Sequence, residues 1–479
     1  MASNEYINRY LVNCGGVNNT LPDELIADNE LSDSSNIVPG EQGQQNLVKR
    51  AGYAQHLAGT ASQTVYSLYS GIRNRFYATY NTGTATDFCI YDLDAAAAAL
   101  YSHTDPITNY HWASFNANDY FVGGTADSQL ITATDTTFAD WTGILDTIQI
   151  IEVYNNFMFG TLKGGRTLYW SAISDPATWP AANNLVFGLG PEKDWPTALQ
   201  AHGDVLVMFT QRNFYHIFGT EELGMRITYS NKDVGCIGQH AALSTAHGLI
   251  WWSPMHGIVI SRDGYKIETP MLDKIRKTWD TVVDYQDSTI HGIWRPDFQC
   301  ARFFVKSGAA ATANLRIDYY PKGDRFFLQP LTNLTSPKAS LVYINNTFGT
   351  STISEYTTSG IKPMVENLAS AQDDSNTLTD YMETKRQAGV AGPIAKKVTI
   401  NVQLTTKVGT TGAVSVQIYR NNATSAETAI TPTVAAGVDD TLIGINAEYN
   451  KIKFRIGDSL NERTEYYSLV EAGKITEVM

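Results

Sequence analysis

The chain has 479 residues, of which 43% are hydrophobic and 11% aromatic, enough to fill two or three cores rather than one. Its formal net charge is -13, and because residues 380–479 hold eleven basic and eleven acidic side chains, the acidic excess lies entirely on residues 1–379. Affinity for nucleic-acid phosphates comes from lysine and arginine, so an acidic body of this kind excludes a protein that grips DNA.

Motifs for chemistry are missing from the sequence. The four cysteines lie far apart, which excludes a zinc knuckle and a dense disulfide framework and predicts free thiols. The chain contains no H-E-x-x-H, no G-x-S-x-G and no phosphate-binding glycine loop. We therefore expect no enzyme activity, no catalytic, cofactor-binding or metal-binding residues, and no cofactor.

Residues 1–55 read as an extended arm with lead-in strands, rich in Pro, Gly, Asn and Asp turn chemistry. The start of the chain lacks a basic segment followed by an apolar core, and no run approaches about 18 apolar residues. We expect a soluble chain with no export signal and no membrane insertion.

From about residue 60, short aromatic or aliphatic runs are broken at intervals of 37 to 49 residues by a turn residue. These breaks lie at Asn74, Asn118, Asn155, Gly203, Gly248, Asp297 and Asn345. Repeats of this length are typical of propeller blades, each a small antiparallel sheet. The pattern predicts an all-β protein with a β-propeller over residues 56–368, of six or seven blades with seven favoured; a pair of β-sandwiches is the alternative.

A helix is predicted within the propeller, over residues 270–285. Thr269 can cap it, Pro270 suits its first position, and apolar residues recur along one face. The opposite face carries Lys274, Arg276 and Lys277. One interpretation is a helix packed on a sheet with a solvated basic face; the other is a helix that docks a partner.

The last part of the chain reads as a separate small domain. The polar stretch 369–380 has the composition of a linker, and residues 381–479 alternate apolar and polar residues over strand lengths. This pattern predicts a C-terminal β-sandwich.

The segment "LYWSAISDPATWPAANN" invites comparison with the Asp-box of sialidase-like propellers, Ser-x-Asp-x-Gly-x-Thr-Trp. It lacks the glycine, and Trp179 follows Asp175 by four residues rather than five. We interpret it as a structural turn, in which Asp175 accepts backbone N–H groups, Pro176 fixes φ and Trp179 covers the hairpin end. The stretch "TDTTFADWTG", residues 134–143, is a looser copy in the preceding repeat.

A glycosidase is the enzyme alternative, since it needs only two carboxylates about 5 to 10 Å apart. Candidate carboxylates are Asp175, Asp263 and Asp318. A sialidase would also need several arginines converging on one point, whereas the arginines here, such as Arg166, Arg212, Arg262 and Arg302, share no spacing relative to the breaks.

Four segments in the same order carry a resemblance to a known family. They are "LPDELIADNELSDSSNIVP" leading to "KRAGY", then "LYWSAISDPATW", then "GIVISRDGYKIETPMLDKIRKTW", and then "YMETKRQAGVAGPIAKKVTINVQL". Together they resemble the tail hub or nozzle proteins of short-tailed bacteriophages, called packaged-DNA stabilisation protein or tail tubular protein B.

The resemblance implies a structural virion protein that assembles in the host cytoplasm as a homohexameric ring below the portal and adaptor. Such a ring retains the packaged genome, conducts the DNA during ejection without sequence-specific binding, and anchors fibre, spike or needle proteins. A tail-tip propeller that recognises host glycan is the alternative function.

Overall fold

The computed structural model describes most of the chain, and the statements below concern that part. It covers residues 5–477 without residues 11–13, 24, 41–45, 57–63, 73–74, 82–87, 93–98, 104–110, 124–127, 133–134, 146–147, 163, 188–193, 221–223, 270–271, 284–289, 332–333, 335–336, 338, 346–351, 360–361, 369, 374, 389–395, 410, 422, 424–428, 450 and 461–462.

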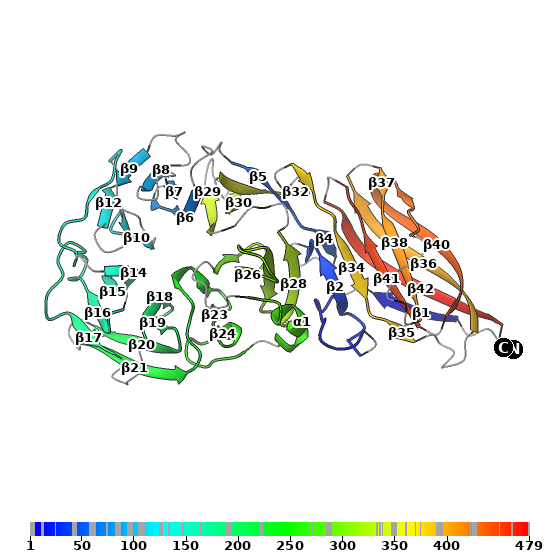
Figure 1. Cartoon of the computed structure of the whole chain (residues 1–479), viewed down its shortest axis with the longest axis horizontal. Helices are drawn as coiled ribbons and strands as arrows, with labels where there is room; N and C mark the ends of the chain where they lie inside the picture. The colour runs from blue at the N-terminus through cyan, green and yellow to red at the C-terminus, as the bar shows by residue number, and fades with distance from the viewer. Residues whose placement is uncertain are drawn as a thin grey trace.

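Residues 52–367 form a β-propeller (Figure 1), as the repeat pattern predicts. The described residues give seven antiparallel sheets in this part of the chain. Their strands are β6 (Thr64–Ser70), β7 (Phe76–Asn81), β8 (Phe88–Asp92) and β9 (Ala99–His103); β10 (His111–Phe115), β11 (Asn118–Val122), β12 (Ser128–Thr132) and β13 (Ala139–Asp140); β14 (Ile148–Tyr154), β15 (Phe157–Leu162), β16 (Thr167–Trp170) and β17 (Asn184–Val186); β18 (Pro196–His202), β19 (Val205–Thr210), β20 (Asn213–Thr220) and β21 (Gly224–Lys232); β22 (Ala242–Thr245), β23 (Gly248–Ser253) and β24 (Gly257–Ser261); β25 (His291–Arg295), β26 (Cys300–Val305), β27 (Leu315–Tyr320) and β28 (Arg325–Pro330); and β29 (Ser340–Asn345), β30 (Thr352–Ser359), β31 (Lys362–Asn367) and β5 (Gly52–Gln55).

The breaks in the sequence lie between the first and second strands of these sheets or at the end of one of them; Asn74 itself lies outside the described residues. Asn155 and Asn156 show why such residues are needed, because they adopt φ values of 48° and 61° between β14 and β15. Two consecutive left-handed residues make the two-residue turn that matches the twist of a hairpin, and asparagine tolerates this conformation.

The first strands of the sheets lie side by side around one axis. Contacts join β10 to β14, β14 to β18, β18 to β22, β22 to β25, β25 to β29, and β29 to β6. The Tyr69 hydroxyl lies 2.6 Å from the Ser114 hydroxyl and joins β6 to β10. The ring is closed by β5 from the beginning of the chain, which pairs with β31 so that Tyr53 faces Glu366.

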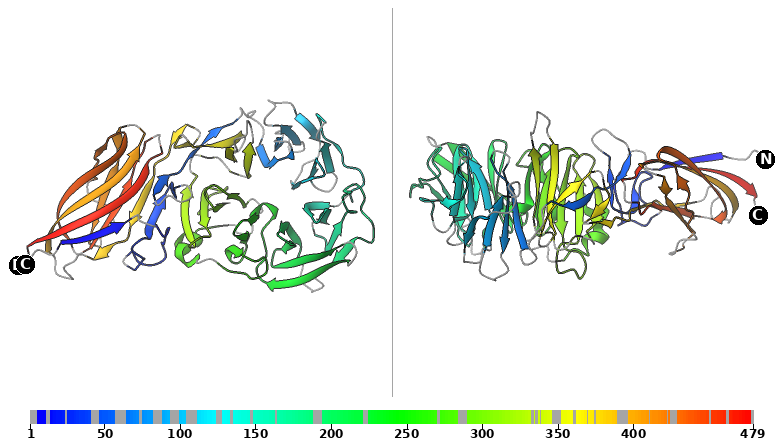
Figure 2. Two further views of the ribbon diagram at one scale, coloured as in Figure 1. Left: turned by 180° about the vertical axis from the view of Figure 1, so that it is seen from behind. Right: turned by 90° about the horizontal axis from the view of Figure 1, so that it is seen from above.

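The second domain is a sandwich of two sheets, and strands from both ends of the chain build it (Figure 2). One sheet contains β1 (Glu5–Tyr10), β3 (Ile37–Pro39), β4 (Leu47–Lys49), β36 (Lys396–Val408), β40 (Gly437–Tyr449) and β42 (Glu465–Glu477). The other contains β2 (Leu31–Ser35), β34 (Tyr381–Thr384), β35 (Gln387–Ala388), β38 (Ser415–Arg420) and β41 (Lys451–Gly457), and the short strands β37 (Gly412–Ala413) and β39 (Thr433–Val434) pair beside it.

This pairing corrects the expected domain boundaries. The arm 1–55 is not a separate unit, because β1 and β4 pair with β42, β2 pairs with β34, and β5 belongs to the propeller. A strand cannot leave its backbone N–H and C=O groups unpaired in a buried setting, so the early strands join the sheets built by residues 381–479. The propeller is therefore inserted into the sandwich domain.

The expected linker 369–380 is also built into the fold. It contains the hairpin of β32 (Gln372–Asp373) and β33 (Asn376–Thr377), and Ala371 and Asp373 are buried. Gly52 packs directly on this hairpin, since a Cβ atom there would lie 2.0 Å from the Gln372 carbonyl oxygen. The stretch is polar because its side chains form hydrogen bonds and ion pairs, not because it is a free spacer.

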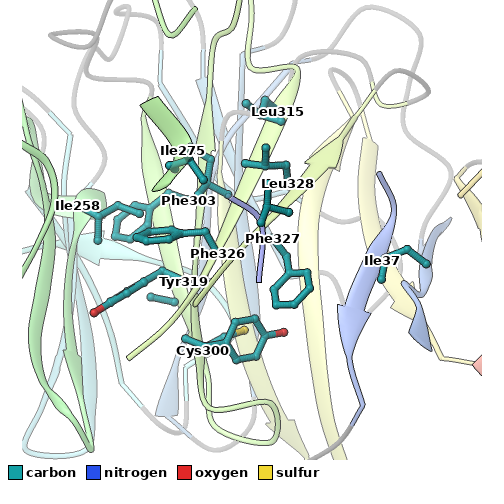
Figure 3. Packing of buried hydrophobic residues seen from close by; sticks show 14 of the residues in the cluster. Ile37, Ile258, Ile275, Cys300, Phe303, Leu315, Tyr319, Phe326, Phe327 and Leu328 are labelled. Carbon is teal, nitrogen blue, oxygen red and sulfur yellow. The ribbon is translucent and has the colours of Figure 1, made fainter. Parts of the chain in front are cut away.

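A shared apolar core joins the two domains (Figure 3). Ile37 of β3 belongs to the same cluster as Phe327 and Leu328 of β28. The Gln329 side chain donates to the Ile37 carbonyl oxygen (2.6 Å), and the Val17 N–H donates to that of Phe326 (2.9 Å). The sandwich is thus packed and hydrogen-bonded onto the outermost strand of one propeller sheet.

The predicted helix is shorter than residues 270–285. A 3-10 turn, η3 (Leu272–Ile275), leads into the four-residue α1 (Arg276–Trp279), and Pro270 and Met271 lie outside the described residues. The chain then becomes extended, and Val282 forms a β-bridge with Ser307. β-branched valines favour this extended pairing over a further helical turn.

Candidate functional site

The chain crosses between its two domains at a cluster of buried charges, which we call the crossing point: Lys49, Asp380, Asp458 and Tyr466. The Lys49 ammonium lies 2.6 Å from Asp458 Oδ1 and 3.5 Å from Asp380 Oδ1. The Tyr466 hydroxyl lies 2.8 Å and 3.0 Å from the Oδ2 atoms of the two aspartates. Three segments far apart in the sequence are thereby fixed to one another.

Two carboxylates share one ammonium at the crossing point. Burial, with the neighbouring charge of Asp458 as the second cause, raises the pKa of Asp380 to about 8. At neutral pH Asp380 therefore holds a proton, while Asp458 and Lys49 form the ion pair. A buried charge that loses its partner is strongly destabilising, so both sides of this pair are needed.

Arg50, the next residue, is held on the propeller side. Its guanidinium makes a two-pronged contact with Asp373, at 3.0 Å from Oδ1 and 2.5 Å from Oδ2, and its Nε donates to Asn36 Oδ1 at 2.8 Å. Asp373 Oδ1 also accepts the Tyr53 backbone N–H at 3.1 Å. Lys49 and Arg50 thus join β4 to the sandwich and to the closing hairpin of the propeller.

A second buried network, which we call the seam cluster, lies between the sheet of β25–β28 and the sheet that β5 closes. Its members are Tyr53, Arg295, Arg302, Arg316, Asp318, Glu355 and Glu366, and all are buried. Arg295 Nη1 lies 2.9 Å from Glu355, and Arg302 Nη1 lies 3.0 Å from Glu366. Although burial opposes ionisation, the charges of Arg295 and Arg302 hold the pKa of Glu366 well below its ordinary value.

Tyr53 attaches the closing strand to the seam cluster. Its hydroxyl accepts a hydrogen bond from Arg316 Nη1 at 2.7 Å and donates to Glu355. Three arginines converge in the seam cluster. Each forms an ion pair with a buried carboxylate, and none of the three side chains is exposed to solvent. The seam cluster therefore closes the propeller ring rather than offering a pocket for a substrate carboxylate.

The candidate glycosidase carboxylates belong to three different sheets. Asp318 is buried and lies 2.9 Å from Arg316 Nε. Asp175 accepts the Ala177 N–H at 3.1 Å, and Asp263 accepts those of Tyr265 and Lys266 at 2.8 Å and 2.6 Å. Each aspartate thus has local partners of its own.

Of the candidate arginines, Arg302 lies in the seam cluster and Arg262 forms an exposed pair with Glu268. Arg166 lies over the Trp195 ring, and the Arg212 backbone N–H donates to Asp194. The arginines named from the sequence do not meet at one point.

The axis of the propeller is occupied by the 3-10 turn η2 (Gln239–Ala241), which follows β21. The Leu199 backbone N–H in β18 donates to Gln239 Oε1 at 2.7 Å, and Gln239 Nε2 donates to the Leu199 carbonyl oxygen at 2.6 Å. The His240 ring stacks on that of His111 in β10, with centroids 5.7 Å apart, and η2 also contacts β25. One turn thus reaches the first strands of three sheets.

Glu152 of β14 also faces this turn. Its Oε2 lies 3.5 Å from Gln239 Nε2, and burial raises its pKa to about 8. The carboxyl group is therefore mainly protonated at neutral pH, when it can donate as well as accept hydrogen bonds.

The turn of Asp175, Pro176 and Trp179 lies between β16 and β17 and packs against the preceding sheet. The indole N–H groups of Trp179 and Trp141 both donate to the Pro176 carbonyl oxygen, at 2.8 Å and 3.1 Å. The two indole rings belong to one apolar cluster, with centroids 6.3 Å apart. The two related sequence segments therefore meet, and the turn joins neighbouring sheets.

The short helix contacts the beginning of the chain. Lys274 forms an ion pair of 3.0 Å with Glu30, and the Arg276 backbone N–H donates to Thr20 Oγ1 at 2.7 Å. The Arg276 side chain pairs with Asp280 at the surface, and Lys277 is exposed. Of the three basic residues, Lys274 binds within the molecule, whereas Arg276 and Lys277 face solvent. Docking of a partner stays a prediction.

One edge of the sandwich is formed by a long strand. The thirteen-residue β40 pairs with β36 along its whole length, and no described strand pairs with its other edge. Val438 and Leu442 of β40 are 65% and 69% exposed, and the exposed Asp440 lies between them. Long open edges are normally covered by another element or another chain, or carry charges. We call β40 with the side chains of Val438 and Leu442 the open edge.

Within the described residues no group of three or more His, Cys, Asp or Glu side chains is placed to hold a metal ion. Cys14, Cys236 and Cys300 are buried free thiols. None of the helices in the described ranges has the length and apolar character needed to cross a bilayer.

Sequence reasoning did not identify the crossing point, the seam cluster or η2. The signals for the first two were charged residues inside apolar strands, as in "CARFFV" and "LRIDYY", which place Arg302, Arg316 and Asp318 at buried positions. Buried charges require partners, but the partners lie on other strands and a single sequence does not name them.

Comparisons with known proteins identify no family for the chain. No family model and no curated protein matches the chain. Among solved structures, the N-terminal domain of Nup159 is similar over 70% of this chain and 98% of its own, with 10% sequence identity and a TM-score of 0.38.

Replacing Trp179 by Ala should lower the free energy of unfolding by about 3 kcal/mol, because the buried ring and its bond to Pro176 are lost. Urea unfolding followed by fluorescence measures the change. Trp179→Phe keeps most of the buried area and should cost less. An alanine variant as stable as the parent would contradict the role of this turn.

Replacing Glu355 by Gln should destabilise the protein by about 3 kcal/mol, because Arg295 and Arg302 lose a buried counter-charge. The matched control is Glu268→Gln, whose exposed pair with Arg262 should contribute no more than about 1 kcal/mol. Equal unfolding midpoints for both variants would show that the seam cluster does not hold the ring closed.

Stability should fall as pH rises from about 4 to about 8. The folded state keeps protons on Asp380 and Glu152 in this window, whereas the unfolded state has released them, so raising the pH favours unfolding. Asp380→Asn and Glu152→Gln should each reduce the loss of thermal midpoint between pH 5 and pH 8.5, and the double variant should reduce it further. A double variant with the parent's pH dependence would refute this assignment.

Proposed function

We propose that the chain is a structural bacteriophage virion protein, a tail hub or nozzle subunit that forms a ring below the portal and adaptor. The ring retains packaged DNA, conducts it during ejection and anchors other tail parts. The observation that carries the assembly step is the open edge, because a strand of thirteen residues with exposed Val438 and Leu442 is suited to contact with a neighbouring subunit. The resemblance of four sequence segments to this family supplies the sixfold ring and the viral setting.

The occupied axis supports a channel between subunits rather than through one. The His111 and His240 rings, from β10 and η2, lie 5.7 Å apart at the axis. These two rings are stacked, and the same turn bonds to β18 and contacts β25, so side chains fill this part of the axis. A DNA duplex, whose major groove alone is about 12 Å wide, does not fit there. DNA that passes such a protein must therefore pass along the outside of the propeller, as it would in the lumen of a ring.

The charge distribution supports sliding rather than binding of DNA. The acidic excess falls on residues 1–379, which contain the propeller, whereas residues 380–479 are balanced. A negatively charged wall makes no lasting contacts with phosphates, so passage of the genome would not be slowed by counterion-releasing binding.

Ring formation can be tested on the purified full chain by mass photometry, light scattering and negative-stain electron microscopy. The parent should form closed rings of several copies. Leu442→Lys places a charge on the open edge and should weaken each contact by about 2 kcal/mol, or about 30-fold in each association constant.

The matched control is Leu25→Lys, which changes a leucine of 67% exposure away from the open edge and should leave the rings intact. A parent protein that stays monomeric at the highest soluble concentration would overturn the proposed assembly. Rings that tolerate Leu442→Lys would place the subunit contact elsewhere and overturn the role of the open edge.

A further inference from the structure

The sandwich carries a hollow on the outer face of the sheet formed by β34, β41 and β38. We call it the sandwich pocket; its volume is about 390 Å³, within the usual range for small-molecule sites. Its polar lining comes from Thr379, Tyr381, Ser415, Gln417, Arg455 and Ser459. The open edge lies on the other sheet, so the pocket is a separate feature.

Strand register brings the pocket residues together. Gln417 lies directly opposite Arg455, and Ser415 lies opposite Gly457. Gly457 makes room at the floor, because a Cβ atom there would lie 2.0 Å from the Asp380 carbonyl oxygen. Behind the floor is the crossing point, so the pocket is built on a part of the sandwich that buried charges hold in place.

Arg455 is held in one orientation but is not fully used. Its guanidinium lies over the Tyr381 ring, 3.6 Å from the centroid, and 3.7 Å from Glu383 Oε1. Glu383 has a closer partner in Lys453, at 2.5 Å. Arg455 also forms a side-chain hydrogen bond with Tyr419, but its side chain is 33% exposed and its five N–H donors exceed what these contacts take up. Arg455 lines the pocket, so a guanidinium held in place borders it.

The surroundings of Arg455 favour a neutral ligand over an anion. Glu383 lies beside the guanidinium, and Lys453 also pairs with Asp23, so two carboxylates balance these two cations. Apart from the carboxyl groups of Asp380 and Asp458, the other polar side chains of the lining carry hydroxyl and amide groups, which both donate and accept hydrogen bonds. Vicinal hydroxyl groups match this mixture, because each hydroxyl also donates and accepts.

We propose that the sandwich pocket binds a neutral saccharide of one or two rings, with Arg455 donating to adjacent hydroxyl oxygens and Ser415 and Gln417 bonding further hydroxyls. The pocket's size and its mixed donors and acceptors carry this assignment. It does not rest on the proposed ring assembly, since the pocket lies within one chain.

The test is saturation-transfer NMR and calorimetry of the full chain with glucose, galactose, mannose, N-acetylglucosamine, maltose and lactose. Glucuronate and inorganic phosphate serve as anionic probes. At least one neutral sugar should bind the parent. Arg455→Met should weaken this binding about tenfold or more, because a hydrogen bond from a charged donor is lost. Arg276→Met, which changes an exposed arginine far from the pocket lining, should leave binding unchanged.

Ser415→Trp is the second variant. It fills the pocket from a half-buried position without removing a buried contact, so it tests the site even if Arg455→Met fails to fold. Circular dichroism and the thermal midpoint report folding. The proposal is overturned if no neutral sugar binds the parent, if only glucuronate or phosphate binds, or if sugar binding survives Ser415→Trp in the folded protein.

Discussion

Two consecutive buried cations, Lys49 and Arg50, hold the molecule together where the chain leaves one domain for the other. Lys49 pairs with Asp458 beside Asp380 in the sandwich, and Arg50 pairs with Asp373 on the hairpin that leads back from the propeller. Neither cation can be exposed without opening both domains. The inserted propeller, the shared core and the sandwich pocket all depend on this junction, because each is built from segments that meet at it.

An inserted domain sets a particular order of folding. β1 pairs with β42 so that Glu5 faces Lys474, and β5 pairs with β31 so that Tyr53 faces Glu366. Both pairings close long loops. The entropy cost of closing a loop grows only slowly with loop length, but contacts between residues far apart in the sequence form slowly during folding. The sandwich can be completed only after the last strand exists, and until then its early strands have no partners. Intermediates with unpaired strand edges are therefore expected in folding.

Local features of the fold could be predicted from the sequence, and non-local ones could not. Asn155 marks a hairpin and Trp179 ends a turn, because turn chemistry and burial of an indole act over a few residues. The pairing of Glu355 with Arg302, 53 positions apart, follows from the curvature of the whole ring. The helix expected over residues 270–285 is shorter than its periodicity predicts. Val282 has a strand partner in Ser307, and periodicity does not reveal such a partner. Site residues were missed for the same reason, since their partners lie on distant strands.

The position of the two termini has a mechanical consequence. The start of β1 and the end of β42 lie at the tip of the sandwich that is farthest from the propeller (Figure 2), and β1 runs antiparallel to β42 from that tip. A force applied between the termini would separate this pair one hydrogen bond at a time, as in peeling, before it loads the propeller. A force applied between the termini and the far side of the propeller would instead pass through Lys49, Arg50 and the shared core, and would meet the full resistance of the junction.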